Sequence, residues 1–127
     1  MKAKSILDQW VGAINAGDIE AAIALYNNQA VLIPTFLGYM LNDPGAIRGY
    51  FERLAKNPAL SVSLHEDSVR EQACSETVFV LSGLYTFRFE VDGRLMNFES
   101  RFTFVVDSGT DAPILHHHSS QIPRSFA

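Results

Sequence analysis

The chain has 127 residues, of which 47% are hydrophobic and 19% charged, and 14 acidic against 10 basic residues give a formal net charge of -4. This length is typical of a single domain, spanning 1–127, that buries its own core. The acidic balance argues against nucleic-acid binding through a basic surface. No apolar stretch is long enough to cross a bilayer, so we expect no membrane partner.

The single cysteine, Cys74, has no partner for an internal disulfide, which favours a reducing compartment. The residues after Met1 predict a helix and do not resemble a secretory signal. We therefore expect a cytoplasmic protein in which Cys74 is a small buried hydrophobe.

The N-terminal third is predicted to be helical. Apolar residues recur at helical spacing at Ile6, Leu7, Trp10, Val11 and Ile14. Asp18 is a candidate N-cap for a second, shorter helix, whose expected apolar face is Ile19, Ala22, Ile23 and Tyr26. A strand follows at Ala30–Pro34.

A third helix is predicted after Asp43 and Pro44, which supply an N-cap and a proline at the first helical position. Its apolar positions follow the helical period at Ile47, Tyr50, Phe51 and Leu54.

From residue 60 onward the period changes from helical to twofold. Alternation predicts strands over 60–64, 78–89 and 95–106, and Asp92-Gly93 predicts a tight hairpin between the last two. A further strand carries the histidines after residue 113. Helices followed by strands predict an α+β domain, with N-terminal helices packed on one face of a curved, mainly antiparallel sheet.

The strand over 95–106 places apolar residues on both of its faces. One face has Phe98, Ser100, Phe102, Phe104 and Val106, and the other has Glu99, Arg101, Thr103 and Val105. A second apolar face favours a homodimer formed through the sheet. In the alternative, the aromatic residues only thicken one core.

Three of the four histidines are consecutive, and serines follow them in Leu115-His116-His117-His118-Ser119-Ser120. Histidine titrates near neutral pH and can move a proton or orient a water molecule. On a regular strand His116 and His118 share one face, about 7 Å apart, while His117 points to the other. The three cannot ligate one ion there, so we expect neither a metal nor another cofactor.

Five segments carry a family resemblance over nearly the whole chain: 31–35, 47–51, 83–87, 101–104 and 116–120, the last with Pro123. They resemble the nuclear transport factor 2-like cone, also called SnoaL-like or cystatin-like, in the bacterial branch related to the association domain of calcium/calmodulin-dependent protein kinase II. The segment 116–120 also resembles the signature of iota-class carbonic anhydrases.

The resemblance implies a polar pocket inside the cone. It places Leu115, His117 and Ser119 inside and His116, His118 and Ser120 on the opposite face. It also implies pocket hydroxyls at Thr35, Tyr50 and Tyr85, and an arginine of the kinase pocket at Arg101, whereas a second such arginine is replaced here by Ser119.

The activity that the resemblance implies is reversible, metal-free hydration of carbon dioxide. In this hypothesis His117 accepts a proton from a water held by Ser119, Thr35 or Tyr50, and Arg101 or the hydroxyls stabilise bicarbonate, with Tyr85 assisting. The alternatives are a non-catalytic small-ligand-binding or oligomerisation domain and a SnoaL-like isomerase or hydratase. The last is less favoured because no acidic residue lies on a predicted pocket face.

Overall fold

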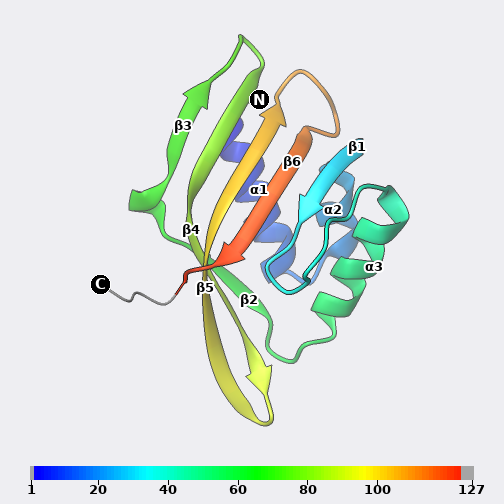
Figure 1. Ribbon diagram of the computed structural model, residues 1–127, viewed down its shortest axis with the longest axis vertical. Coiled ribbons are helices and arrows are strands. Elements are labelled where there is room, and N and C mark those ends of the chain that lie inside the picture. The colour runs from blue at the N-terminus through cyan, green and yellow to red at the C-terminus, as the bar shows by residue number, and fades with distance from the viewer. Residues whose placement is uncertain (1, 124–127) are drawn as a thin grey trace.

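The computed structural model describes residues 2–123 (Figure 1). The elements in chain order are α1 (Ala3–Asn15), α2 (Ile19–Ala24), β1 (Tyr26–Ile33), α3 (Pro44–Ala55), β2 (Ser61–Leu64), the 3-10 helix η1 (Glu66–Ser68), β3 (Arg70–Ala73), β4 (Val78–Val91), β5 (Arg94–Asp107) and β6 (Ile114–Gln121). The predicted α+β class is confirmed.

The six strands form one open, mixed sheet in the order β1-β6-β5-β4-β2, with β3 also paired to β4. The consecutive strands β4, β5 and β6 form the predicted antiparallel meander. Strand β1 pairs with β6 in parallel, and the three α-helices lie on one side of the sheet (Figure 1). Strand β3 was not predicted, and all four of its side chains are exposed, so it lacks the apolar alternation of a buried strand.

Both predicted helix caps are present. The Asp18 carboxylate accepts the Ala21 backbone N–H at 3.1 Å, and the Asp43 carboxylate accepts the Ala46 backbone N–H at 2.9 Å, with Pro44 opening α3. Capping satisfies backbone donors that have no partner within the helix.

The prediction that Tyr26 lies on the second helix is wrong. Helix α2 ends at Ala24, and Tyr26 is the first residue of β1. The chain leaves the helix because the Leu25 carbonyl accepts the Ile114 backbone N–H at 2.8 Å, which begins the pairing with β6. Tyr26 is therefore a buried residue of a strand and not of a helix.

The core lies between the helices and the inner face of the sheet. Helix α1 buries its predicted face, with Trp10 only 1% exposed, against inward side chains of β4, β5 and β6. Asn15 at the end of α1 exchanges two hydrogen bonds with the Val62 backbone, at 2.7 and 2.9 Å, and so fixes α1 to β2.

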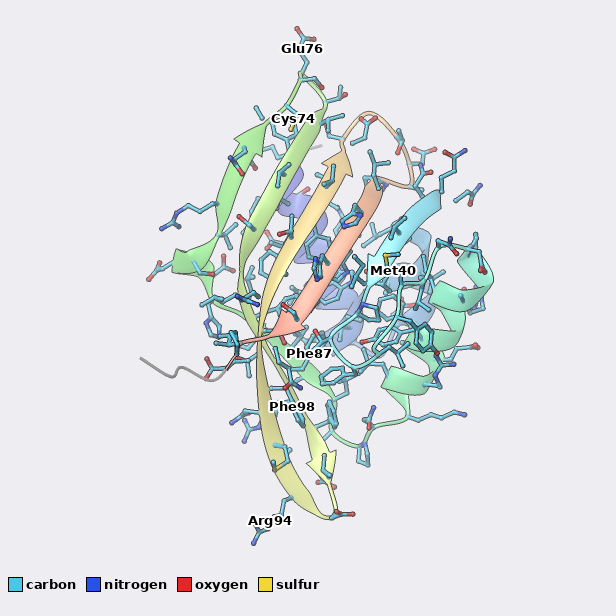
Figure 2. All side chains as sticks on the ribbon, viewed as in Figure 1. Met40, Cys74, Glu76, Phe87, Arg94 and Phe98 are labelled. Carbon is cyan, nitrogen blue, oxygen red and sulfur yellow. The ribbon has the colours of Figure 1, made fainter. Side chains whose placement is uncertain are left out.

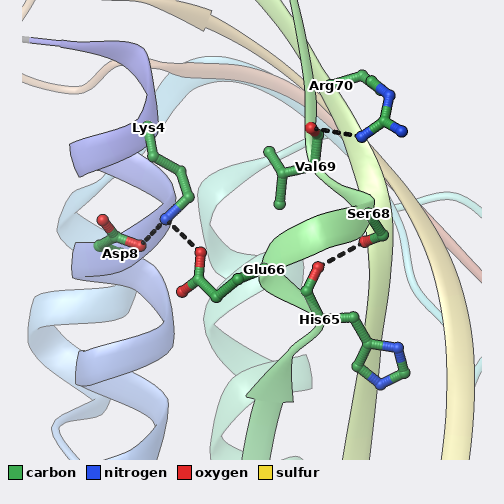
Figure 3. A network of polar contacts seen from close by, with 7 residues as sticks. All are labelled: Lys4, Asp8, His65, Glu66, Ser68, Val69 and Arg70. Carbon is green, nitrogen blue, oxygen red and sulfur yellow. Dashed lines mark hydrogen bonds and ion pairs between the residues drawn. The ribbon is translucent and has the colours of Figure 1, made fainter.

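A second tie joins α1 to η1 (Figure 3). The Lys4 ammonium lies 2.6 Å from an Asp8 carboxylate oxygen and 2.9 Å from one of Glu66. The Ser68 hydroxyl donates to the His65 carbonyl at 2.7 Å and accepts the Leu84 backbone N–H at 2.9 Å. The segment between β2 and β3 is thus held at both α1 and β4.

Strand β6 contains an irregularity that corrects one expectation. His116 pairs with Val105, but Ile114 pairs with Val106, so Leu115 is an extra residue in the ladder. Ile114 is therefore buried and Leu115 is only half-buried, although Leu115 was expected inside the cone. Beyond the irregularity, His117 and Ser119 face inward as expected.

The predicted hairpin turn is confirmed at Asp92 and Gly93, whose φ angles of 53° and 78° are the left-handed values of a tight turn. The β4–β5 hairpin extends past the other strands, with Arg94 near its tip (Figures 1 and 2).

Cys74 is exposed, so the expectation of a buried thiol is wrong. It lies just after β3, close to the turn that carries Glu76 (Figure 2). Among residues 2–123, no helix is long and apolar enough to cross a membrane.

Candidate functional site

A small cavity lies between α1, α3 and the inner face of the sheet. We call it the inner cavity. Its lining is Trp10, Leu32, Pro34, Thr35, Tyr50, Phe51, Tyr85, Phe87, His117 and Ser119. Five of the six predicted site residues are in this set. The cavity volume of about 10 Å³ is close to the minimum that one water molecule needs.

A continuous chain of hydrogen bonds leads into the inner cavity. The Trp10 indole N–H donates to the Tyr26 hydroxyl at 3.0 Å, and that hydroxyl lies 2.7 Å from His117 Nδ1. On the other side of the ring, His117 Nε2 lies 3.0 Å from the Tyr85 hydroxyl, which donates to Ser119 Oγ at 2.6 Å. Both nitrogens of His117 are therefore engaged.

The chain ends at a pair of hydroxyls. Ser119 Oγ is hydrogen-bonded to Thr35 Oγ1, which lies just beyond the end of β1. Strand pairing brings the two together, because Leu32 and Ile33 pair with His117 and His118 in the parallel β1–β6 ladder.

Trp10 fixes the direction of this chain. An indole N–H only donates, so the Tyr26 oxygen accepts from it and keeps its own hydrogen for His117 Nδ1. The ring hydrogen then lies on Nε2 and is donated to Tyr85, which agrees with Tyr85 donating onward to Ser119. The opposite direction would leave the Tyr26 hydroxyl hydrogen without an acceptor, at a cost of about 1–3 kcal/mol.

Burial keeps the central groups of the chain neutral. Desolvation lowers the pKa of His117 well below its ordinary value, and the charges of His116 and His118 lower it further. Desolvation also raises the pKa values of Tyr26 and Tyr85. The His117 ring lies flat on Phe104, with centroids 3.8 Å apart, which completes an apolar enclosure.

Tyr50 lies on the opposite wall from the sheet, on α3, and is 6% exposed. Burial raises the pKa of its hydroxyl, and a backbone hydrogen bond from Phe36 and the positive charge of Arg53 oppose that rise. Tyr50 also lines a second cavity of about 200 Å³, which we call the outer hollow. Its lining is Phe36, Leu37, Tyr50, Arg53, Leu54, Asn57 and Phe89.

Arg101 is the predicted site residue that the structure does not bring to the inner cavity. It is exposed on β5, next in sequence to the inward Phe102, and its guanidinium lies 3.4 Å from Ser120 Oγ. Neighbouring residues on a strand point to opposite faces, so Arg101 and Ser120 share the outer face of the sheet. The inner cavity therefore has no arginine in its lining.

His116 and His118 also lie outside the inner cavity. His118 is exposed and His116 half-buried, and they pair with Thr103 and Val105 of β5. Throughout residues 2–123, no group of three or more His, Cys, Asp or Glu side chains is arranged to hold a metal ion.

Two members of the hydrogen-bond chain, Trp10 and Tyr26, were not predicted from the sequence. Both occupied apolar positions of helical patterns and were treated as packing residues only. A buried tryptophan or tyrosine usually finds a partner for its polar atom, and this is the signal that could have identified them.

An open cone of helices on a curved sheet, with a polar cavity inside it, defines the nuclear transport factor 2-like class of domains. The chain belongs to the SnoaL-like domain family, whose model matches residues 3–125. No curated protein sequence matches the chain.

Solved structures agree with this class. A protein from Xanthomonas campestris, described as a calcium/calmodulin-dependent protein kinase II association domain, has a TM-score of 0.84 and 25% identity, covering 96% of this chain and 86% of that one. A protein of Streptomyces avermitilis, described as a dehydratase of the NTF2-like family, has a TM-score of 0.81 and 13% identity over 95% and 94% of the chains. An NTF2-like protein with a cystatin-like fold from Novosphingobium aromaticivorans has a TM-score of 0.74 and 12% identity over 96% and 80%.

Proposed function

We propose that the inner cavity, which has room for about one water molecule as it stands, widens to admit carbon dioxide or bicarbonate and catalyses their interconversion without a metal. One observation carries this proposal. Thr35, Tyr50, Tyr85, His117 and Ser119 come from the end of β1, from α3, from β4 and from β6, and they surround one cavity with room for a water molecule. The resemblance of 116–120 to iota-class carbonic anhydrases gives this geometry its chemical interpretation.

The hydroxyls have two roles in the proposed reaction. Ser119 and Thr35 hold the water molecule, while Tyr50 is the neighbouring hydroxyl available to an oxygen of bicarbonate and Tyr85 donates its hydrogen to Ser119. Negative charge grows on the substrate oxygens during hydration, and fixed donors in a dry cavity stabilise it more than water does. In this proposal hydroxyl groups stabilise bicarbonate in place of Arg101.

His117 exchanges protons with the cavity through Tyr85 and Ser119, since both of its ring nitrogens are already bonded. The resting chain points its hydrogens toward the cavity, which suits a hydrogen bond to an oxygen of bicarbonate. For hydration the chain reverses, so that Ser119 accepts a proton from water, Tyr85 accepts one from Ser119, and His117 Nε2 accepts one from Tyr85. His117 then carries the proton as an imidazolium until it is released to solvent, and dehydration follows the same path in reverse. Zinc lowers the pKa of bound water from about 16 to about 7, and a neutral imidazole gives no such acidification, so we expect modest turnover.

The test is stopped-flow hydration of carbon dioxide by chelator-treated protein. Ser119→Ala and His117→Ala should abolish the rate above buffer, whereas Ser120→Ala and His118→Ala, on the outer face, should keep it. Wild-type activity no higher than buffer would overturn the proposal. Loss on chelation with recovery on adding zinc would overturn its metal-free part alone.

The second candidate function is a non-catalytic ligand-binding or assembly domain. The observation favouring it is the likeness at 25% identity to a protein described as an association domain. The inner-cavity hydroxyls are also bonded to one another, so they hold the fold even without a substrate.

We also propose a homodimer formed through the outer face of the sheet. Thr103 and Val105 on β5 and His116 on β6 are all half-buried there, with no helix covering them (Figure 1). A sheet face of this kind is often covered by a second copy. A cytoplasmic location remains our expectation from the single cysteine.

A further inference from the structure

Arg53 is a cation without an ion-pair partner at the rim of the outer hollow. Within residues 2–123, no carboxylate lies within ion-pair distance of it. Arg48, five residues earlier on α3, makes two hydrogen bonds to Glu20, at 2.6 and 2.9 Å. A position near the helix C-terminus suits an arginine, so the helix alone could explain its charge. The helix does not explain why the unpaired Arg53 guanidinium lies beside a cavity.

The outer hollow is mostly apolar. Phe36, Leu37, Leu54 and Phe89 supply its hydrocarbon surface, with the Phe36 and Phe89 rings 5.5 Å apart. Asn57 stands at the rim, held by a hydrogen bond from its amide to the Leu54 carbonyl at 2.9 Å. A volume of about 200 Å³ is below the usual range for drug-sized ligands and suits a molecule of a few carbon atoms.

We propose that the outer hollow binds a small organic anion, a monocarboxylate with a short aliphatic chain. The Arg53 guanidinium pairs with the carboxylate through two parallel hydrogen bonds, and the aliphatic chain packs on Phe36, Leu37 and Phe89. A bound ligand lies against Tyr50, the residue that the outer hollow shares with the inner cavity. This binding does not depend on carbon dioxide hydration and is measured without it.

The experiment is a calorimetric titration of the full chain with hexanoate and, separately, with neutral hexanamide. Hexanoate should bind saturably, and both the change to hexanamide and the variant Arg53→Gln should weaken binding about tenfold or more, as expected for a charged hydrogen bond. Lys56→Gln removes a neighbouring cation that does not line the outer hollow, and its affinity should stay within about twofold of wild type. Leu37→Gln should weaken binding by reducing the apolar surface.

Amide shift changes in a parallel NMR titration should centre on residues 36–37 and 53–57. Equal binding of hexanamide, or unchanged affinity in Arg53→Gln, would overturn the proposal, because charge recognition would then be absent. No saturable binding up to about 10 mM hexanoate would overturn it as well. Circular dichroism of each variant separates loss of binding from loss of fold.

Discussion

The indole nitrogen of Trp10 on α1 lies 3.0 Å from the hydroxyl oxygen of Tyr26 on β1. This contact determines which way every hydrogen bond points between there and Ser119, since the indole has no acceptor atom to offer. A residue with no direct hydrogen bond to His117 thereby selects the tautomer of His117.

We predict that His117 carries its hydrogen on Nε2, and that Tyr26→Phe weakens this preference. Without the Tyr26 hydroxyl, Nδ1 loses the donor that keeps it unprotonated. Long-range ¹H–¹⁵N NMR of the imidazole nitrogens distinguishes the two tautomers. The same Nε2 tautomer at full population in Tyr26→Phe would contradict the assignment of the tautomer to the hydrogen bond from Tyr26.

The free energy of unfolding should fall as the pH is lowered from about 7 to about 5. The folded-state pKa of His117 is well below its unfolded value, so the unfolded chain binds the proton first. Stability is then complete above the unfolded pKa and is lost as the pH falls through it, by at most about 1.4 kcal/mol per pH unit for one histidine. Urea titrations across this range measure the slope.

The variant His117→Phe should flatten that slope. His118→Gln, which removes an exposed histidine, should leave most of it in place. An equally steep slope in His117→Phe would show that other groups carry the pH dependence.

Ser119→Ala should destabilise the fold by about 1–3 kcal/mol, because the buried Tyr85 hydroxyl loses the acceptor of its hydrogen. The matched change Ser120→Ala, one residue along and on the outer face, should cost less than about 0.5 kcal/mol. Chemical denaturation of the two variants provides the comparison. Similar losses would contradict the separation of the two faces.

Gly83→Ala and Gly12→Ala should change stability in opposite directions. A Cβ at Gly83 on β4 would lie 2.9 Å from Ser68 Oγ and 3.0 Å from a Phe102 ring carbon, and such overpacking costs about 1–3 kcal/mol. At Gly12 on α1 nothing lies within 4 Å of the added Cβ, and alanine favours a helix over glycine by about 0.5–1 kcal/mol. Thermal unfolding of both variants tests the pair.

Light scattering in solution should give the mass of a dimer for the wild type and of a monomer for Val105→Glu, which places a charge on the outer face of the sheet. The control Leu95→Glu lies at the exposed hairpin tip and should remain dimeric. A monomeric wild type would exclude the proposed dimer.

Much of the fold could be predicted from local patterns. Asp18 and Asp43 predict helix starts because their carboxylates can cap a helix. Asp92-Gly93 predicts a hairpin because these residues can adopt the positive φ of a tight turn. The position of Tyr26 could not be predicted, because it depends on a hydrogen bond between Leu25 and Ile114, which are far apart in sequence. The helical spacing of apolar residues includes Tyr26, but pairing with β6 places Tyr26 in strand β1.

The candidate site could be predicted where local strand geometry decides which face a residue occupies, and not elsewhere. Alternation along β6 correctly separated His117 and Ser119 from His116 and His118, because strand geometry is local. Alternation failed at Leu115, where an extra residue shifts the β5–β6 ladder. Alternation along β5 places Arg101 on the outer face, whereas the family resemblance placed it in the pocket.

The parallel pairing of β1 with β6 joins residues 31–33 to residues 116–118. During synthesis β1 must therefore wait, with its β6-facing edge unpaired, until residues 116–118 have been made. A product that stops before β6 leaves that edge open to association with other chains, and it lacks His117 and Ser119 as well. Strand β6 thus both completes the sheet and supplies His117 and Ser119 to the inner cavity, so a molecule with a complete sheet also has its pocket.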